Sequence, residues 1–311
     1  MTLMLESVAC NLCGQNDYEV LLIRKDLTLF VPGDFRVVKC KNCGMVYLNL
    51  RPTKESFAFI YPEQYDQYTQ ALSRESSWLN RMDRGYGLTK RARAIINYKS
   101  EGCLLDIGCA TGDFIEVMRD HYGWRVYGVE PSISASDYAH RLLGLEVTAG
   151  TVETIGYEKG SFDVVTMWNV IEHLPDPLGT LKYIRTLLKP DGLLVFNTPN
   201  LDSLDAHLFG PYWIGFEMPR HFYVFSRHTL QCMLTRAGFR IIETRCLYGS
   251  HAAFMSSLRF WLRAQKMPAS LRGLLETCIF SRLVRALMLP LFYISDSQRA
   301  STAPTDFCVP S

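Results

Sequence analysis

Two pairs of cysteines near the start of the chain are spaced to bind a metal ion. Each pair has two residues between its cysteines and a glycine directly after it: Cys10-Asn11-Leu12-Cys13-Gly14 and Cys40-Lys41-Asn42-Cys43-Gly44. This spacing lets both sulfurs of a pair point at one ion, and four thiolates complete the tetrahedral shell that Zn²⁺ prefers. A shell filled by protein ligands is typical of a structural site. The sequence therefore predicts a structural Zn²⁺ bound by Cys10, Cys13, Cys40 and Cys43.

Composition and charge support this interpretation of the cysteines. The N-terminal segment shows no basic start followed by an apolar run, so we expect no secretory leader and a cytoplasmic protein. In a reducing compartment cysteines serve as thiols or metal ligands rather than as disulfides or a redox pair, the alternatives here. The 26 residues between the pairs fit a zinc ribbon with an inserted hairpin. The net charge of +2, from 33 basic and 31 acidic residues, predicts no nucleic-acid partner.

A second chemical signal is a glycine turn between an apolar strand and a helix, in the run Leu104-Leu105-Asp106-Ile107-Gly108-Cys109-Ala110-Thr111-Gly112-Asp113-Phe114. Glycine lets the backbone approach a ligand closely, and the first N–H groups of the helix face that ligand. The spacing is neither that of a phosphate loop nor that of the dinucleotide fingerprint. Asp106 places a carboxylate at the strand end, which suits a cationic ligand such as S-adenosylmethionine. Glu130 ends the next strand, where a carboxylate can accept hydrogen bonds from ribose hydroxyls.

This arrangement resembles the class I S-adenosylmethionine-dependent methyltransferase family over residues 101–249. The resemblance extends to three later segments: Gly150-Thr151-Val152-Glu153, placed where that family contacts adenine; Ser161-Phe162-Asp163-Val164-Val165, which matches its fourth strand; and Leu187 to Val195, which matches the helix, turn and strand that follow. The resemblance implies a bound S-adenosylmethionine. We assign seven residues to its site: Asp106, Gly108, Cys109, Gly112, Glu130, Val152 and Asn169.

Candidate reactive groups follow the strand predicted at 162–167. His173 can act as a general base because imidazole titrates near working pH, and Glu172 stands beside it. In polyprenyl-catechol O-methyltransferases, which this segment resembles, a further Glu three residues before the Glu-His pair belongs to a Mg²⁺ site. Asn169 stands at that place here, so we predict no metal ion there. The alternative is that Glu172 and His173 are a structural hydrogen-bonded pair that shapes the loop.

A second candidate base, His221, lies in an aromatic segment after the strand predicted at 193–197. Residues 210–226 combine aromatic side chains with Glu217, Arg220 and His221, and such a mixture is typical of a ligand pocket. The Pro-Arg-His run resembles the methyltransferase branch associated with modification of sugars, polyketides and cell surfaces. The alternative is a lid packed by aromatics in which His221 is hydrogen-bonded to the backbone.

An alternation of strands and helices must bring these groups to one edge of a sheet. Strands are predicted at 103–107, 124–129, 162–167, 193–197 and 240–244, and helices at 113–122, 133–143, 178–188 and 228–237. Lys189-Pro190-Asp191-Gly192 ends the third of these helices in a turn, and Ser226 caps the fourth. The alternation predicts an α/β fold with a doubly wound, mostly parallel, Rossmann-like sheet.

The chain divides into four predicted regions. These are a zinc-ribbon module at 1–50, a helical linker or lid at 51–100, the S-adenosylmethionine-binding domain at 101–249, and a helical extension with a disordered tail at 250–311. Residues 251–295 are apolar and rich in arginine, which predicts a helical cap or, alternatively, peripheral contact with an anionic membrane. Their longest apolar run is too short to span a bilayer.

The motifs together predict a methyltransferase that acts on a small or carrier-linked substrate. Our first hypothesis is a sugar or a cell-surface glycan precursor, because the aromatic segment and the zinc module resemble those of some sugar methyltransferases. The second is O-methylation of a quinone or polyketide hydroxyl. The third is an RNA-binding or RNA-modifying protein that docks through the zinc ribbon. O-methylation and C-methylation both need a base and stay open, as does the choice between the two histidines.

Overall fold

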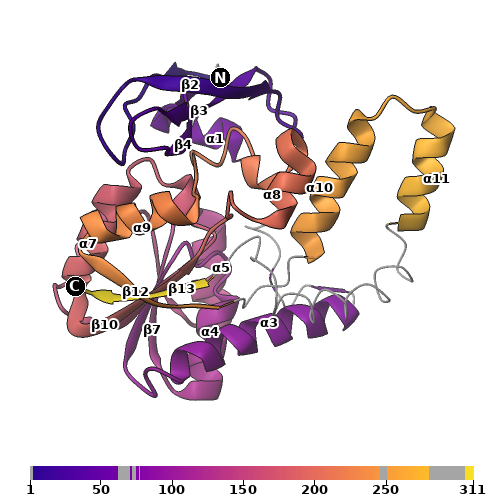
Figure 1. The fold of residues 1–311 in the computed structure, drawn as a ribbon. Coiled ribbons are helices and arrows are strands. Elements are labelled where there is room, and N and C mark those ends of the chain that lie inside the picture. Colours follow the sequence, from indigo (N-terminus) through magenta and orange to yellow (C-terminus); the bar gives the residue numbers. More distant parts are fainter. Residues whose placement is uncertain (1–2, 62–70, 72–74, 77, 246–250, 280–304) are drawn as a thin grey trace.

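The computed structural model describes residues 3–61, 71, 75–76, 78–245, 251–279 and 305–311, and a seven-stranded sheet forms its centre (Figure 1). The strand order is β12-β13-β10-β9-β6-β7-β8, with bounds β6 Cys103–Ile107, β7 Arg125–Glu130, β8 Glu146–Ala149, β9 Phe162–Trp168, β10 Leu188–Asn197, β12 Phe239–Arg245 and β13 Thr305–Pro310. From β10 to β8 all neighbours pair in parallel. The predicted doubly wound, mostly parallel α/β fold is confirmed.

Helices cover both faces of this sheet, which explains why its central strands are mostly apolar. All five residues of β6 are buried. One face packs on α3 Trp78–Ile96, α4 Asp113–Tyr122 and α5 Ile133–Leu143, and the other on α6 Val152–Ile155, α7 Pro177–Leu187 and α9 Arg227–Arg236. Helix α3, from the predicted linker, therefore belongs to the layered domain (Figure 1).

Local capping side chains set the helix starts close to where they were predicted. Ser132 accepts a hydrogen bond from Ala135 N at 3.3 Å, and Ser226 accepts one from Thr229 N at 3.1 Å. These bonds satisfy N–H groups that have no partner inside the helix. One expectation differs: the turn predicted at 189–192 is part of β10, which shifts its register against β9 between Leu188 and Leu193.

The N-terminal module is a small antiparallel sheet that includes one short strand from residues 223–224. Its order is β11-β4-β3-β2, with β2 Tyr18–Arg24, β3 Phe35–Cys40, β4 Val46–Leu48 and β11 Tyr223–Val224. A two-stranded ladder joins β1 Leu5–Glu6 to β5 Arg51–Pro52, and η1 Lys54–Ser56 and α1 Phe57–Ile60 follow. Strands β2 and β3 are the hairpin expected between the cysteine pairs. Because β11 lies within the aromatic segment (210–226), the module and this segment share one sheet.

The prediction of a disordered tail is wrong for residues 305–311. Residues 305–310 form β13, which lies between β10 and β12 and pairs antiparallel with both. Phe307 and Cys308 are fully buried there. The six-residue strand is too short to be recognised by its pattern, and it is stabilised by partners that lie far away along the chain.

Two helices, α10 His251–Ala264 and α11 Ala269–Ile279, form the described part of the helical extension (Figure 1). Helix α10 packs on the segment that contains α8 Leu204–Phe209, η4 Gly210–Tyr212 and η5 Ile214–Phe216: Ser257 Oγ accepts a hydrogen bond from Ile214 N at 3.0 Å. The extension predicted over 280–295 lies outside the described residues. Within the described ranges, no helix is both long and apolar enough to cross a bilayer. Contact with a membrane surface stays a prediction.

Candidate active site

The four cysteines of the N-terminal module meet in one cluster, with all four sulfurs within 4.8 Å of one another. The Sγ atoms of Cys10 and Cys43 lie 3.5 Å apart, as do those of Cys13 and Cys40. Sulfurs bound about 2.3 Å from a tetrahedral Zn²⁺ would be separated by roughly 3.8 Å. A disulfide requires about 2.05 Å between sulfurs. The spacing therefore fits a four-thiolate metal site and excludes a disulfide between these facing cysteines.

Tight turns after each cysteine pair give the cluster its shape. Gly14 N donates to Cys10 O at 2.7 Å, and Gly44 N donates to Cys40 O at 2.9 Å. Both glycines have positive φ, +79° and +75°, which side-chain-bearing residues rarely adopt. The glycine that trails each pair thus has the role expected from the sequence.

The first turn also binds the α/β domain through Asn11. Its Nδ2 donates to Asp176 Oδ1 at 2.7 Å, and its Oδ1 accepts from Leu178 N at 3.0 Å, so it caps α7 together with Asp176. A guanidinium from α9, that of Arg236, donates to the carbonyl of Leu12. The turn of the first cysteine pair is therefore attached directly to two helices of the domain.

The glycine turn after β6 has the geometry of a ligand loop. Gly108 and Gly112 adopt φ of +72° and +85°, and Ala110 adopts +48°. A Cβ on Gly108 would lie 2.6 Å from Val170 Cγ2, so only glycine fits there. Cys109 is buried, and a Cβ on Gly128 would lie 2.7 Å from its sulfur. The thiol thus lies beneath the loop, and Cys109 offers a ligand its backbone only.

Asp106 ends β6 as a buried carboxylate, 2% exposed. Thr166, its partner residue in β9, donates to Asp106 Oδ1 at 2.6 Å. Burial raises the pKa of Asp106 to about 7, against the opposing effects of the Thr166 hydroxyl and of Arg91. A buried carboxyl group with a raised pKa favours the binding of a cation, because the cation compensates the negative charge that burial has removed from water.

Glu130 ends β7 and holds the glycine loop against that strand. One carboxylate oxygen accepts from Ala110 N at 2.9 Å and the other from Ser132 N at 2.8 Å. Burial raises the pKa of Glu130 despite these two bonds. The predicted acidic pair, Asp106 and Glu130, thus lies at the carboxyl ends of neighbouring parallel strands, where α/β sheets bind ligands.

Two further predicted cofactor residues lie on either side of this loop in the sheet. Val152 is buried at the first position of α6, just after β8. Asn169 follows β9 with φ of +56°, and its Oδ1 accepts from Asn197 Nδ2 at 2.9 Å. Asn197 Oδ1 accepts from Asn169 N at 3.0 Å. This reciprocal amide pair fixes the turn next to Gly108, and the sequence offered no signal for Asn197.

The structure brings the three predicted reactive residues together from two segments. One carboxylate oxygen of Glu172 and one ring nitrogen each of His173 and His221 lie within 4.8 Å of one another. The centroids of the two imidazole rings are 4.6 Å apart, with an angle of 80° between the ring planes. His221 Nδ1 faces Gly215 O at 2.9 Å, as the alternative of a backbone-bonded histidine expected. Glu172 Oε2 accepts from Thr198 at 3.0 Å, whereas its Oε1 is buried and has no hydrogen-bond partner among the described residues.

Burial controls the charge of this cluster. It holds the pKa of His173 well below its ordinary value, an effect to which the neighbouring His221 adds. It also lowers the pKa of His221, although Glu217 opposes the change. The same burial raises the pKa of Glu172 to about 8. In the ligand-free protein at neutral pH the two imidazoles are therefore neutral and able to accept a proton.

Tyr61 is a site residue that sequence reasoning missed. Its hydroxyl lies 2.8 Å from His173 Nδ1, and the ring packs edge-on against that imidazole. It comes from the region predicted as a linker, at the end of α1. The Tyr-Pro sequence around Tyr61 matches no functional motif, so its place beside His173 is known only from the fold.

The aromatic segment is a packed interior. Trp213, Phe216 and Phe222 are buried in the hydrophobic core that joins the module to the sheet. Tyr223 is buried too, and its hydroxyl donates to Pro175 O at 3.2 Å. The expected aromatic walls of a ligand pocket are thus closed in this structure, which matches the alternative of a packed lid.

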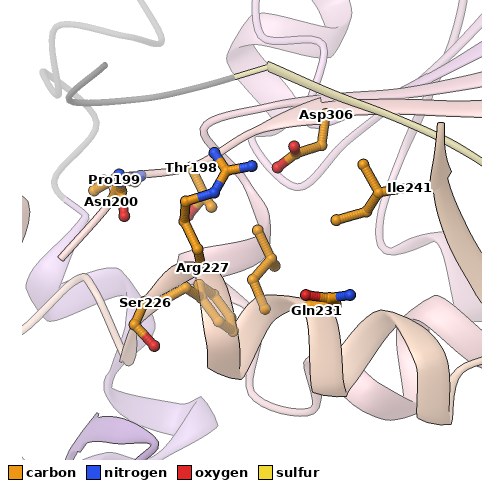
Figure 2. A pocket seen from close by; sticks show the side chains of 10 residues that line it. Thr198, Pro199, Asn200, Ser226, Arg227, Gln231, Ile241 and Asp306 are labelled. Atoms are coloured by element: carbon orange, nitrogen blue, oxygen red, sulfur yellow. The ribbon is translucent and has the colours of Figure 1, made fainter. Parts of the chain in front are cut away.

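A small cavity of about 40 Å³ lies behind Thr198, between β10 and the start of α9 (Figure 2). Arg227 reaches across it toward Thr198 and Asp306 (Figure 2). A volume of this size holds a few water molecules but no acceptor substrate. Thr198 lines this cavity and also donates a hydrogen bond to Glu172, so the cavity lies next to the cluster of Glu172, His173 and His221.

Relatives of the chain were found among curated proteins. A ubiquinone biosynthesis O-methyltransferase of Coxiella burnetii is 33% identical over 111 residues, 34% of this chain and 47% of that protein. A tRNA U34 carboxymethyltransferase of Desulfotalea psychrophila is 28% identical over 149 residues, 46% of this chain and 47% of that protein. The chain spans about half the length of the curated relatives it matches.

The fold and family are supported by two further comparisons. A chain from the complex between the Haloferax volcanii Trm112 methyltransferase activator and a methyltransferase matches with a TM-score of 0.51 at 16% identity, over 75% of this chain and 92% of that one. This likeness supports the fold alone. A family model described as a methyltransferase domain matches residues 81–244, just over half of the chain. The chain therefore belongs to the methyltransferase-domain family.

Proposed function

We propose that the chain moves a methyl group from S-adenosylmethionine to a hydroxyl, or a carbon, of a small or carrier-linked acceptor. One observation carries the proposal. The glycine loop with Asp106 and Glu130 and the cluster of Glu172, His173 and His221 lie at the same carboxyl edge of the sheet. Strands β6 and β9 pair in register up to Ile107 and Met167, so the two groups follow adjacent strand ends.

Residues of the loop would hold the cofactor through complementary charge. Asp106 offers a buried carboxylate to a cationic group, Glu130 offers acceptors for the ribose hydroxyls, and Val152 offers an apolar contact for the adenine. When bound, S-adenosylmethionine supplies a methyl group already activated by its sulfonium. The chain then needs to orient the acceptor and take its proton.

A neutral histidine of the cluster would take that proton. His173 is our first choice because the Arg220 carbonyl faces its Nδ1 at 3.0 Å. A carbonyl only accepts hydrogen bonds, and the Tyr61 hydroxyl at 2.8 Å from the same nitrogen can accept as well while it donates to that carbonyl. This arrangement favours a proton on Nδ1 and leaves the Nε2 lone pair for the acceptor's proton. His221 also has its Nδ1 against a carbonyl, that of Gly215, but its Nε2 lies 3.7 Å from Glu217 Oε2, and it is the second candidate. Glu172 lies beside both imidazoles, and its carboxyl would stabilise the imidazolium that forms by giving up its own proton.

The proposed acceptor is a sugar or glycan precursor, and a quinone-type hydroxyl is the second candidate. The first rests on the four-cysteine module and the Pro-Arg-His segment. The second is favoured by the resemblance to the Coxiella burnetii ubiquinone enzyme over a third of the chain. Because another relative is named a tRNA U34 carboxymethyltransferase, methylation of RNA is kept as one possible outcome of the test. We also propose a structural Zn²⁺ at the four cysteines.

The test combines cofactor binding with a search for the acceptor. Purified protein is titrated with S-adenosylmethionine and then given methyl-labelled cofactor and a fractionated cell extract. Label in glycan precursors supports the first acceptor class, label in quinones the second, and label in RNA would replace both. His173→Gln should lose transfer yet keep cofactor binding, whereas His140→Gln, a change of the same kind on exposed α5, should keep both. Absence of cofactor binding at millimolar concentration would refute the proposal.

A further inference from the structure

The loop between β2 and β3 of the four-cysteine module is organised around one buried carboxylate, that of Asp26. Its Oδ1 accepts from Thr28 N at 2.8 Å and from Leu29 N at 3.3 Å, and its Oδ2 accepts from Val31 N at 3.2 Å. Its side chain is fully shielded from solvent. Three backbone bonds therefore fix the carboxylate within its own loop.

The same carboxylate binds the guanidinium of Arg220, which belongs to the aromatic segment. Nη1 donates to Asp26 Oδ2 and Nη2 to Oδ1, each at 2.9 Å, and Nε donates to Glu217 Oε1 at 2.9 Å. Two parallel bonds fix the direction of a guanidinium as well as its position. Both side chains of the Asp26–Arg220 pair have no exposed area. The module therefore holds Arg220 rigidly from outside the α/β domain.

The backbone around Arg220 carries the reactive cluster. The carbonyl oxygen of Arg220 faces His173 Nδ1 at 3.0 Å, and the next residues are fixed on both sides. Phe222 N donates to Glu172 O at 2.8 Å, and His221 N donates to Glu217 O at 2.9 Å. The Tyr61 hydroxyl lies 2.8 Å from the same nitrogen and can donate as well as accept. A displacement of Arg220 would thus remove the neighbour that only accepts, and both tautomers of His173 would become accessible.

The chemistry of the ion pair favours a positioning role over a stabilising one. Removing two charges from water carries a large desolvation penalty, and apolar residues of similar volume often stabilise a fold as well or better. Burial raises the pKa of Asp26, and the bonds from Arg220 and from the loop outweigh it, so the net pKa is below the ordinary value. The pair is thus fully ionised at neutral pH. A charged, bidentate pair fixes the direction of the Arg220 guanidinium, which an apolar contact would not do.

We propose, on the basis of the function proposed above, that Asp26 is a positioning residue for the reaction centre. It fixes Arg220, and the Arg220 carbonyl fixes the tautomer and direction of the His173 imidazole. The metal-binding module is then part of the frame that holds the base. It acts on the reaction without contact to cofactor or acceptor.

The test compares Asp26→Asn with Asp17→Asn in the full chain. Asp17 is the matched control because it lies in the same module and forms an exposed ion pair with Lys41. Nitrogen NMR of ¹⁵N-histidine-labelled protein reports the tautomer of each imidazole, with His173→Gln assigning the signal. We expect wild type and Asp17→Asn to show a single neutral Nδ1–H form of His173. In Asp26→Asn that signal should become a mixture of the two neutral tautomers.

Catalysis supplies the second readout. Misplacement of a reacting group by about 1 Å can lower the rate on the order of 100-fold, so kcat of Asp26→Asn should fall by 10- to 100-fold while the Kd for S-adenosylmethionine is unchanged. If Asp26→Asn does not fold, Asp26→Glu keeps the charge and shifts the carboxylate by one methylene, and the same NMR change is expected. An unaltered His173 spectrum in the folded variants, or an equal change in Asp17→Asn, would overturn the proposal. The NMR result is independent of the acceptor, so it stands apart from failure of the proposed function.

Discussion

Replacing Asp106 by asparagine should make the ligand-free protein more resistant to unfolding at alkaline pH while removing its cofactor site. The carboxyl has a pKa of about 7 in the folded chain and an ordinary value of 3.8, and burial is the main cause. Each pKa unit corresponds to about 1.36 kcal/mol, so the whole difference is roughly 4 kcal/mol. Asparagine has the same shape and no charge to desolvate, so it avoids this penalty.

The sign of the pH dependence follows from proton binding. Because the folded pKa is the higher one, the folded state holds the proton between pH 4 and 7 while the unfolded state has lost it. The contribution of Asp106 to stability is therefore present at low pH and is lost as pH rises to about 7. Between pH 5 and pH 8 this loss is roughly 2.5 kcal/mol. Asp106→Asn has no carboxyl at this position and therefore does not show this loss of stability.

Urea unfolding of both proteins at intervals from pH 5 to pH 8, without cofactor, measures the effect. The difference in unfolding free energy between variant and wild type should grow with pH by that amount, and shared groups such as Glu172 cancel in it. In parallel, calorimetry should show S-adenosylmethionine binding to wild type more tightly as pH rises toward 7, with proton release, and no binding to the variant. Parallel stability curves for the two proteins would refute the assignment of Asp106 as a buried, cation-seeking carboxylate.

Three further changes test other parts of the structure. Gly108→Ala should cost about 1–2 kcal/mol from its positive φ and a further 1–3 from contact with Val170, whereas Gly160→Ala, with similar φ and open space, should show only the first cost in urea unfolding. Cys40→Ser should lower the zinc content of purified protein from one equivalent to none by elemental analysis, and unchanged content would contradict the four-cysteine site. Phe307→Ala should destabilise the sheet by about 3–5 kcal/mol in thermal unfolding, and a neutral effect would contradict the burial of β13.

Features that depend on neighbouring residues were predictable from the sequence. The cysteine turns, the strand–glycine–helix run at Asp106 and the cap at Ser226 each need only a few consecutive side chains and a local backbone conformation. The parallel α/β fold followed because apolar strands alternated with helices at short intervals. Zinc, cofactor and acceptor stay proposals, supported by these local patterns and by the geometry they produce.

Features that depend on residues distant along the chain were not predictable. Tyr61, Asn197 and Asp26 are ordinary residues in their own segments, and each acquires its role from a partner 28 to 194 positions away. The error over 305–310 has the same cause, because that short strand is ordered by the ladders of β10 and β12 on either side.

The sequence by itself thus determined the class of fold, and it predicted the cluster of four cysteines and the glycine loop after β6. Short-range sterics and hydrogen bonds set these features. The tertiary structure alone decided that His173 and His221 face one another, that Arg220 and Asp26 join the module to them, and that the chain's last strand completes the sheet. Each of these contacts closes a long loop, and its geometry depends on packing of the whole chain, which no local pattern records.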